Sequence, residues 1–246
     1  MIKFSALSAV VLDIEGTTCP VDFVAATLFP YAANHLQQHL QCHGETAALQ
    51  ELLQLVWDAW AKESDPAAPP VPEGRQPMAT VPYLQWLMIQ DRKFTPLKDL
   101  QGQIWADGYS NGNLLAPLFS DVAPALAAWR QQGIRLAVYS SGSVQAQQLL
   151  YGHTSEGDLC DCFERWYDTK HGPKRQSSSY IALCADLDLT PATVLFISDS
   201  NAELAAAAAA GLQVCGCQRP GNPEPIADQW PAVQQFADLA LKPSAV

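Results

Sequence analysis

The chain has 246 residues, of which 48% are hydrophobic and 16% are charged, and its formal net charge at pH 7 is -11. A chain of this size buries a sizeable core and forms one large domain, or a core with one insertion. Its acidic surface repels a phosphate backbone and an anionic bilayer, which argues against nucleic-acid and membrane partners.

No apolar run approaches the ~20 residues that span a bilayer. The apolar run at 4–12 resembles a secretion signal, but Asp13 and Glu15 interrupt it before a cleavage site. The seven cysteines are irregularly spaced, which favours free thiols in a reducing compartment over a disulfide framework. We therefore expect a cytoplasmic protein.

Four short apolar runs, rich in β-branched or aromatic residues, predict buried strands. They cover residues 9–13, 134–140, 193–199 and 212–218. Helical patterns at 122–132, 177–186 and 201–210 separate the later strands, and Ser120 and Asp121 are candidate caps of the first of these helices. This alternation predicts an α/β fold built on a doubly wound parallel sheet.

More than a hundred residues separate the first predicted strand from the second, and they show helical spacing. Helices are predicted at 27–40, 47–61 and 83–90, and the proline-rich stretch 64–80 is predicted to be a loop. We therefore expect a core of residues 1–19 and 120–246 that carries an inserted helical cap at 20–119.

Polar residues follow three of the predicted strands where those strands end. They are Asp13 and Glu15 after the first, Ser140 and Ser141 after the second, and Asp199 after the third. In a doubly wound sheet the carboxyl ends of the strands line one crevice, so these groups are expected to converge. Any one group is also typical of ordinary turns and caps, but the three together argue for a site.

Each of these residues has a chemical use in such a crevice. The Asp13 carboxylate can attack phosphorus, and Glu15, two residues on, can move a proton. Asp199 adds a second strand-end acid, so that two acids share Mg²⁺, which prefers oxygen ligands. Lys174 supplies positive charge, and the hydroxyls and N–H groups of the helix start after Ser141 suit a phosphate.

The motifs D-x-E-G-T at 13–17, S-S-G-S at 140–143, G-P-K at 172–174 and I-S-D-S at 197–200 resemble the haloacid dehalogenase superfamily of aspartyl phosphohydrolases. More narrowly, the segments 13–18, 139–147, 150–158 and 219–222 resemble the enolase-phosphatase (acireductone synthase) family of methionine salvage. The resemblance implies a bifunctional enzyme. It would enolise 2,3-diketo-5-methylthiopentyl-1-phosphate, then release phosphate to give the acireductone 1,2-dihydroxy-3-keto-5-methylthiopentene.

The resemblance also implies roles for the acids. Asp13 would be the nucleophile and a Mg²⁺ ligand, Glu15 its metal-binding and acid/base partner, and Asp199 a further Mg²⁺ ligand. Glu15 stands where most phosphatases of the superfamily have Asp; an enol leaving group is more acidic than an alkanol, so a less exacting general acid suffices. Glu203, one helical turn after Asp199, is expected to orient Asp199 rather than bind the metal.

By the same resemblance, Ser140 and Ser141 would bind substrate and Lys174 the phosphate. We expect a monomer that acts on a small phosphorylated diketone. No residue is assigned as the base for enolisation, and two clusters of basic residues could face the anionic substrate. One cluster is Arg92, Lys93 and Lys98, and the other is Lys170, Lys174 and Arg175.

Several alternatives remain. A broad-specificity phosphatase of the same superfamily would share the catalytic residues, a haloacid dehalogenase would need no metal, and a non-enzymatic binding protein would need no complete site. His35, His39 and His43 recur at a spacing that can bind a metal on one helix face, but the Glu of a metalloprotease helix is missing. The sequence assigns no function to these three histidines.

Overall fold

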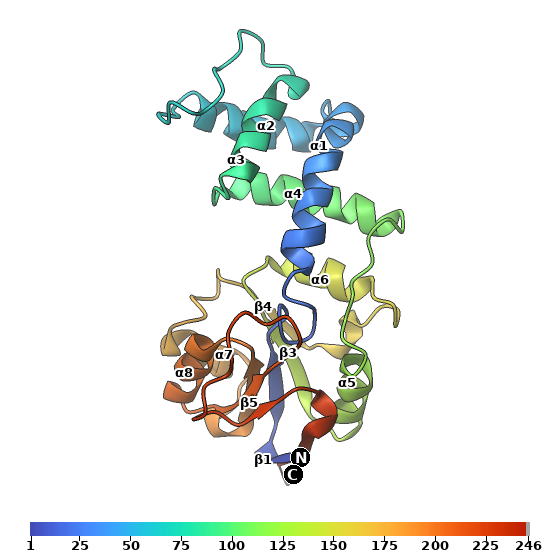
Figure 1. The fold of residues 1–246 in the computed structure, drawn as a ribbon, viewed down its shortest axis with the longest axis vertical. Coiled ribbons are helices and arrows are strands. Elements are labelled where there is room, and N and C mark those ends of the chain that lie inside the picture. The colour runs from blue at the N-terminus through green and yellow to red at the C-terminus, as the bar shows by residue number, and fades with distance from the viewer. Residues whose placement is uncertain (245–246) are drawn as a thin grey trace. The chain divides into compact units, whose positions relative to one another are not determined.

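The computed structural model describes residues 1–244, and the chain divides into two compact units. The α/β unit comprises Met1–Phe23 and the chain from Leu115 onward, and the helical unit comprises Val24–Leu114 (Figure 1). The boundaries expected from the sequence, after residues 19 and 119, lie near these positions. No helix among residues 1–244 is long and apolar enough to cross a membrane.

A six-stranded parallel sheet forms the centre of the α/β unit. Its strands, in spatial order, are β4 (Arg165–Tyr167), β3 (Arg135–Tyr139), β2 (Ala9–Leu12), β5 (Val194–Ser198), β6 (Gln213–Cys217) and β7 (Ala232–Val233). The four predicted strands are confirmed as β2, β3, β5 and β6. They are buried almost throughout, which explains their continuous apolar sequences.

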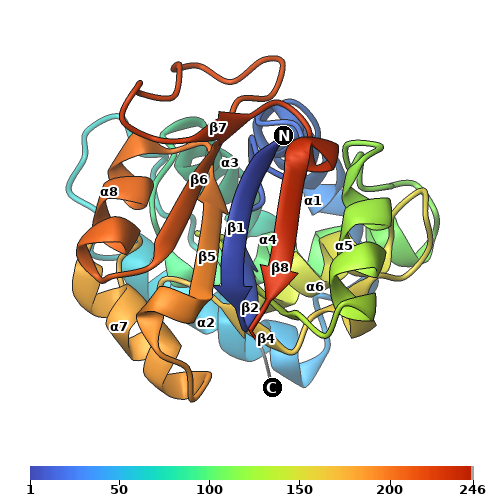
Figure 2. The same cartoon turned by 90° about the horizontal axis from the view of Figure 1, so that it is seen from below.

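Helices cover the sheet on both sides, which confirms the doubly wound α/β fold. They are α5 (Val122–Gln131), α6 (Val144–Gly152), α7 (Ser177–Asp186) and α8 (Asn201–Ala209). Figure 2 shows α7 and α8 on one side and α5 on the other. Of the two candidate caps, Asp121 is the N-cap residue of α5. It makes no capping hydrogen bond, and its carboxylate instead accepts one from buried Arg219 at 2.8 Å.

Two strands that the sequence pattern did not predict form a separate parallel pair. They are β1 (Ile2–Leu7) and β8 (Leu239–Pro243), from opposite ends of the described chain. The short strands β4 and β7 at the edges of the main sheet were also not predicted. All seven cysteines lie within residues 1–244 and are free, as expected.

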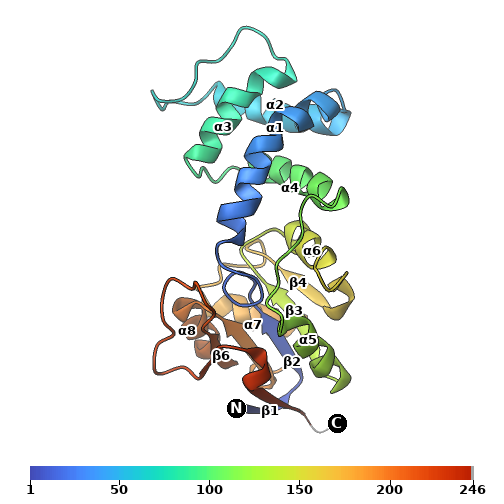
Figure 3. The same cartoon turned by 45° about the vertical axis from the view of Figure 1, so that its right-hand side comes forward.

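The helical unit contains α1 (Phe29–His43), α2 (Ala47–Trp60), α3 (Val81–Ile89) and α4 (Thr95–Ser110) (Figure 3). A π-helical turn, Val24–Leu28, precedes α1, and a 3₁₀ turn, Pro77–Thr80, ends the predicted loop. The predicted helices are confirmed as α1, α2 and α3, whereas α4 was not predicted. Four aromatic rings on α2 and α3 stack in series: Trp57, Trp60, Tyr83 and Trp86.

The sheet register brings the ends of three strands to one level. Leu12 of β2 is opposite Val138 of β3 and Ile197 of β5. β2 lies between these two strands, and the order of the sheet reverses beside it. The residues that follow β2, β3 and β5 therefore emerge at the topological switch point, where α/β sheets bind ligands.

Candidate active site

The Asp13 carboxylate is the centre of the site at this edge of the sheet. Its side chain is 8% exposed, and both oxygens are held. Oδ1 accepts hydrogen bonds from Lys174 Nζ at 2.6 Å and from the Ile14 N–H at 2.8 Å, and Oδ2 accepts from Ser198 Oγ at 3.0 Å. The carboxylate is thus fixed between a cation and a hydroxyl.

Lys174 lies between two carboxylates. Its Nζ is 2.6 Å from Asp13 and 2.7 Å from Glu203, and its side chain is 7% exposed. Burial alone would lower the pKa of Lys174, but Asp13 and Glu203 together raise that pKa above its ordinary value. The lysine is therefore protonated at neutral pH and neutralises part of the charge around the strand ends.

Glu203 does not orient Asp199 as expected. Its Oε2 accepts from Lys174 Nζ and shares the single Ser198 hydroxyl hydrogen with Asp13 Oδ2, since both oxygens lie 3.0 Å from Ser198 Oγ. Glu203 thereby holds the two groups that hold Asp13. The sequence pattern reveals neither this function of Glu203 nor the contact of Ser198. The position of Glu203 one turn into a strand-end helix is the signal that pointed toward the site.

The backbone that carries Lys174 is fixed by three buried hydroxyl groups. The Tyr139 hydroxyl donates to the carbonyl oxygen of Gly172 at 2.8 Å. The Ser179 hydroxyl donates to the carbonyl oxygen of Pro173 at 2.9 Å, and the Tyr180 hydroxyl donates to that of Lys174 at 2.8 Å. A Cβ at position 172 would collide with the Ser179 side chain, so a glycine is needed there. This support pre-orients the ammonium group toward Asp13.

Glu15 and Asp199 add two further acids, each partly buried, beside Asp13. Burial, followed by repulsion from Asp13, raises the pKa of Glu15 to about 7 and that of Asp199 to about 6. Gly16 has a φ of +68°, and a Cβ there would collide with the Asp199 carboxylate. The turn after β2 therefore packs directly against Asp199, which brings the three predicted acids into one neighbourhood.

These acids form a donor set that fits a hard divalent cation. Burial and then repulsion from Asp13 raise the pKa values of Glu15 and Asp199, so a cation between these acids would offset part of that repulsion, and carboxylate oxygens are the ligands that Mg²⁺ prefers. Within residues 1–244, the three do not form a group whose ligand atoms all lie within 4.8 Å of one another.

The two predicted substrate-binding serines occupy different environments. Ser140 is 4% exposed, and its Oγ accepts from the Gly142 N–H at 3.3 Å. Ser141 is exposed, just before α6. Ser143 caps that helix through a 3.3 Å hydrogen bond from Ala146 N–H, so a hydroxyl and free N–H groups meet at this helix start.

The two basic clusters lie in different units. Arg92 pairs with Glu63 at 3.0 Å in the helical unit and lies over the Trp86 ring. Lys170 is exposed in the α/β unit. Arg92 is thus engaged within its own unit, whereas Lys174 of the second cluster contacts the Asp13 carboxylate.

Comparison with known proteins agrees with this geometry. A family model described as haloacid dehalogenase-like hydrolase matches residues 7–211. The chain is 59% identical over 244 residues to enolase-phosphatase E1 of Synechococcus sp. (strain RCC307), covering 99% of this chain and 98% of the relative. It is 45% identical to enolase-phosphatase E1 of Synechococcus elongatus, over 95% of this chain and 98% of the relative.

Solved structures show the same fold. The crystal structure of the UTR4 protein of Saccharomyces cerevisiae matches with a TM-score of 0.78 and 31% identity, covering 95% of this chain and all of that one. CbbY of Rhodobacter sphaeroides matches with a TM-score of 0.57 at 17% identity, which shows the fold alone. From the strand-end acids, the whole-length identity and the shared fold, we conclude that the chain belongs to the enolase-phosphatase family of haloacid dehalogenase-like hydrolases.

Proposed function

We propose that the chain is a bifunctional enolase-phosphatase that converts 2,3-diketo-5-methylthiopentyl-1-phosphate to 1,2-dihydroxy-3-keto-5-methylthiopentene and inorganic phosphate, in methionine salvage. The observation that carries the proposal is the Asp13 carboxylate, held by Lys174 and Ser198 at the switch point of the sheet. The relatives of nearly the same length, named enolase-phosphatase, support the pairing of an enolase and a phosphatase activity in one chain.

Asp13 is the proposed nucleophile of phosphate release. A carboxylate oxygen attacks phosphorus, the bond from phosphorus to the enol oxygen breaks, and that oxygen takes a proton from Glu15. Water then attacks the phosphorus of the aspartyl-phosphate and gives a proton to Glu15, which restores the Asp13 carboxylate and releases phosphate.

Asp13, Glu15 and Asp199 are the proposed ligands of Mg²⁺. When bound, the cation supplies neutralisation of the phosphoryl oxygens and polarisation of the diketone. Lys174, fixed by Asp13 and Glu203, binds the phosphate, and Ser140 and Ser141 bind substrate at the start of α6. Because Lys174 is positioned before substrate arrives, no reorganisation is needed as charge develops.

The remaining parts of the proposal concern the whole chain. We assign the function of a cap domain to the helical segment 20–119, and we propose that the chain is a cytoplasmic monomer. Light scattering on the purified chain tests the monomer: a mass near 26.7 kDa supports it, and twice that mass contradicts it.

Incubation with the diketo-phosphate, followed by enol absorbance and phosphate release together, tests the function. We expect both signals, loss of phosphate release in chelator, and recovery with Mg²⁺. Comparable turnover of simple phosphate esters, with no preference for the diketo-phosphate, would instead indicate a broad-specificity phosphatase. Full turnover in excess chelator would contradict the metal assignment.

A further inference from the structure

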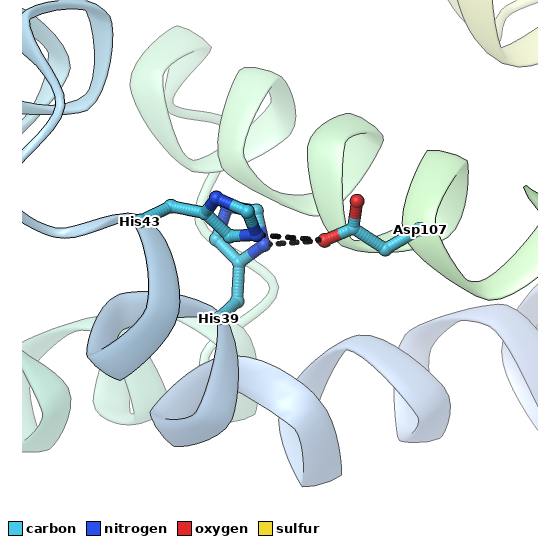
Figure 4. A group of neighbouring side chains, drawn as sticks. All are labelled: His39, His43 and Asp107. Atoms are coloured by element: carbon cyan, nitrogen blue, oxygen red, sulfur yellow. Dashed lines mark hydrogen bonds and ion pairs between the residues drawn. The ribbon is translucent and has the colours of Figure 1, made fainter. Parts of the chain in front are cut away.

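Two histidines and an aspartate converge in the helical unit, outside the candidate active site. His39 and His43 are four residues apart on one face of α1, and Asp107 points toward them from α4 (Figure 4). Asp107 Oδ2 lies 2.8 Å from His39 Nδ1 and 3.7 Å from His43 Nε2. The sequence shows only the histidines, because Asp107 is brought to them by the packing of α4 on α1.

The spacing of these three groups is close to that of metal ligands. One atom from each residue lies within 4.8 Å of the other two. In a tetrahedral zinc site with bonds of ~2.0–2.1 Å, ligand atoms are about 3.3 Å apart. The distances here lie on both sides of that value, so side-chain rotations would place all three atoms around one ion without moving the helices.

The surroundings of His39 favour a ligand at its Nδ1 atom. His39 Nε2 lies 3.3 Å from Gln103 Oε1, which is also on α4. A proton on Nε2 that is donated to Gln103 leaves a lone pair on Nδ1, and this lone pair faces the Asp107 carboxylate, which is also an acceptor. A cation between them satisfies both atoms. Metal-binding histidines usually donate their other N–H to such a partner.

The three groups are open to solvent on one side. The side chains of His43 and Asp107 are 47% and 48% exposed, whereas that of His39 is 6% exposed. All three line a cavity of about 250 Å³, which leaves room for a water ligand in a fourth position. The histidines lie in the last two turns of α1, where the helix dipole is negative and attracts a cation.

We propose that His39, His43 and Asp107 bind a first-row transition-metal dication, with Zn²⁺ as the ion that fits best, and that this ion links α1 to α4. Two imidazoles and one carboxylate suit zinc and its neighbours in that row, whereas Mg²⁺ prefers oxygen ligands alone. The site is therefore separate from the carboxylate site of the α/β unit in its place in the chain and in its ligand chemistry.

Calorimetric titration of Zn²⁺ into the full, untagged chain tests the proposal. Excess Mg²⁺ in the buffer occupies the carboxylate site of the α/β unit. We expect one Zn²⁺ per chain, and an affinity at least about 100-fold weaker in His43→Ala and in Asp107→Asn, because removing a ligand costs at least as much as removing a supporting hydrogen bond. Thermal melting in chelator shows that each variant is folded.

Two variants serve as matched controls. His35 lies two turns before His43 on α1 and lines the same cavity, but its Nδ1 is 2.9 Å from the Tyr31 carbonyl oxygen. His35→Ala and Asp13→Asn are both expected to retain zinc affinity. Co²⁺ in place of Zn²⁺ is expected to show d–d absorption bands without a thiolate charge-transfer band, which excludes Cys42 as a ligand.

Three results would overturn the proposal. The first is no zinc uptake by the wild-type chain in excess Mg²⁺. The second is unchanged affinity in both His43→Ala and Asp107→Asn, which would leave the His39–Asp107 contact as a hydrogen bond between helices and nothing more. The third is an equal loss in His35→Ala, which would place the ion elsewhere on α1.

Discussion

Two clusters of charged and titratable side chains differ in burial and in how they are held. In the α/β unit, Lys174, Asp13 and Glu203 have side chains 7%, 8% and 13% exposed, and each is paired. In the helical unit, the His39 side chain is 6% exposed, but His43 and Asp107 are about half exposed and lie 3.7 Å apart. Removing one partner of a buried pair leaves a charge without solvent, whereas water replaces the partner of an exposed group.

The two clusters therefore suit different tasks. The buried cluster is rigid because any displaced member would leave an unpaired charge, and such preorganisation lowers the barrier to a charge-forming reaction. The half-exposed cluster has little to lose by rearrangement, so it can admit and release an ion.

Lys174→Ala is expected to have the largest effect. It leaves Asp13 and Glu203 buried without their cation, so we expect a loss of about 3–5 kcal/mol in the free energy of unfolding and of roughly 10²–10³ in the rate of phosphate release. Denaturant unfolding and a phosphate assay measure the two effects. Lys170→Ala, at an exposed position, is the control and should stay within about 0.5 kcal/mol of wild type. Similar values for both variants would show that Lys174 is misassigned.

Glu203→Gln is expected to have an intermediate effect. The amide keeps the shape of the side chain but not its charge, so Lys174 is drawn toward Asp13 alone. Loss of one charge-assisted hydrogen bond of about 1.5–3 kcal/mol predicts a fall in kcat of about tenfold or more, with KM changing less. Steady-state kinetics measure this split. An unchanged kcat would mean that Lys174 and Ser198 orient Asp13 without the charge of Glu203.

His43→Ala is expected to change the stability of the metal-free chain very little. His43 and Asp107 are half exposed, so we expect less than about 1 kcal/mol by denaturant unfolding in chelator. A loss as large as that of Lys174→Ala would erase the contrast between the two clusters.

The smallest effect is expected at Glu164, on the surface of the α/β unit. Its carboxylate accepts two hydrogen bonds from Arg135, at 2.6 and 2.7 Å, and these hold the pKa of Glu164 below its ordinary value. The contribution of the pair to stability is therefore complete above ~pH 4.3 and is lost as the pH falls through the lowered pKa. Glu164→Gln should remove this pair's contribution to the fall of stability with falling pH. It should lower the free energy of unfolding at pH 7 by at most about 1 kcal/mol. Unfolding curves with an unchanged acid slope would contradict this.

The sequence predicts the central strands because they are buried on both faces and read as continuous apolar runs. It does not predict β4, whose Arg165–Tyr167 segment has three residues and only one buried side chain. Helix α4 is also not predicted, since its glycines interrupt the apolar pattern. One of them, Gly108, is needed because a Cβ there would collide with the Tyr31 ring.

The sequence also indicates which acids gather at the strand ends, but not how their side chains are paired. Glu203 was expected beside Asp199 and instead contacts Lys174, because the direction of a side chain on a helix depends on packing against residues far along the chain. The same reason hides Asp107, which is 68 residues from its partner His39.

The most direct test of the central assignment is to trap the covalent intermediate. Phosphorus-labelled diketo-phosphate, mixed with the chain and quenched in acid within one turnover, should leave label on the peptide that contains Asp13. The label should be released by hydroxylamine, which cleaves acyl phosphates, and it should be absent from Asp13→Asn. Label on another residue, or label that persists in Asp13→Asn, would contradict the assignment of Asp13 as the nucleophile.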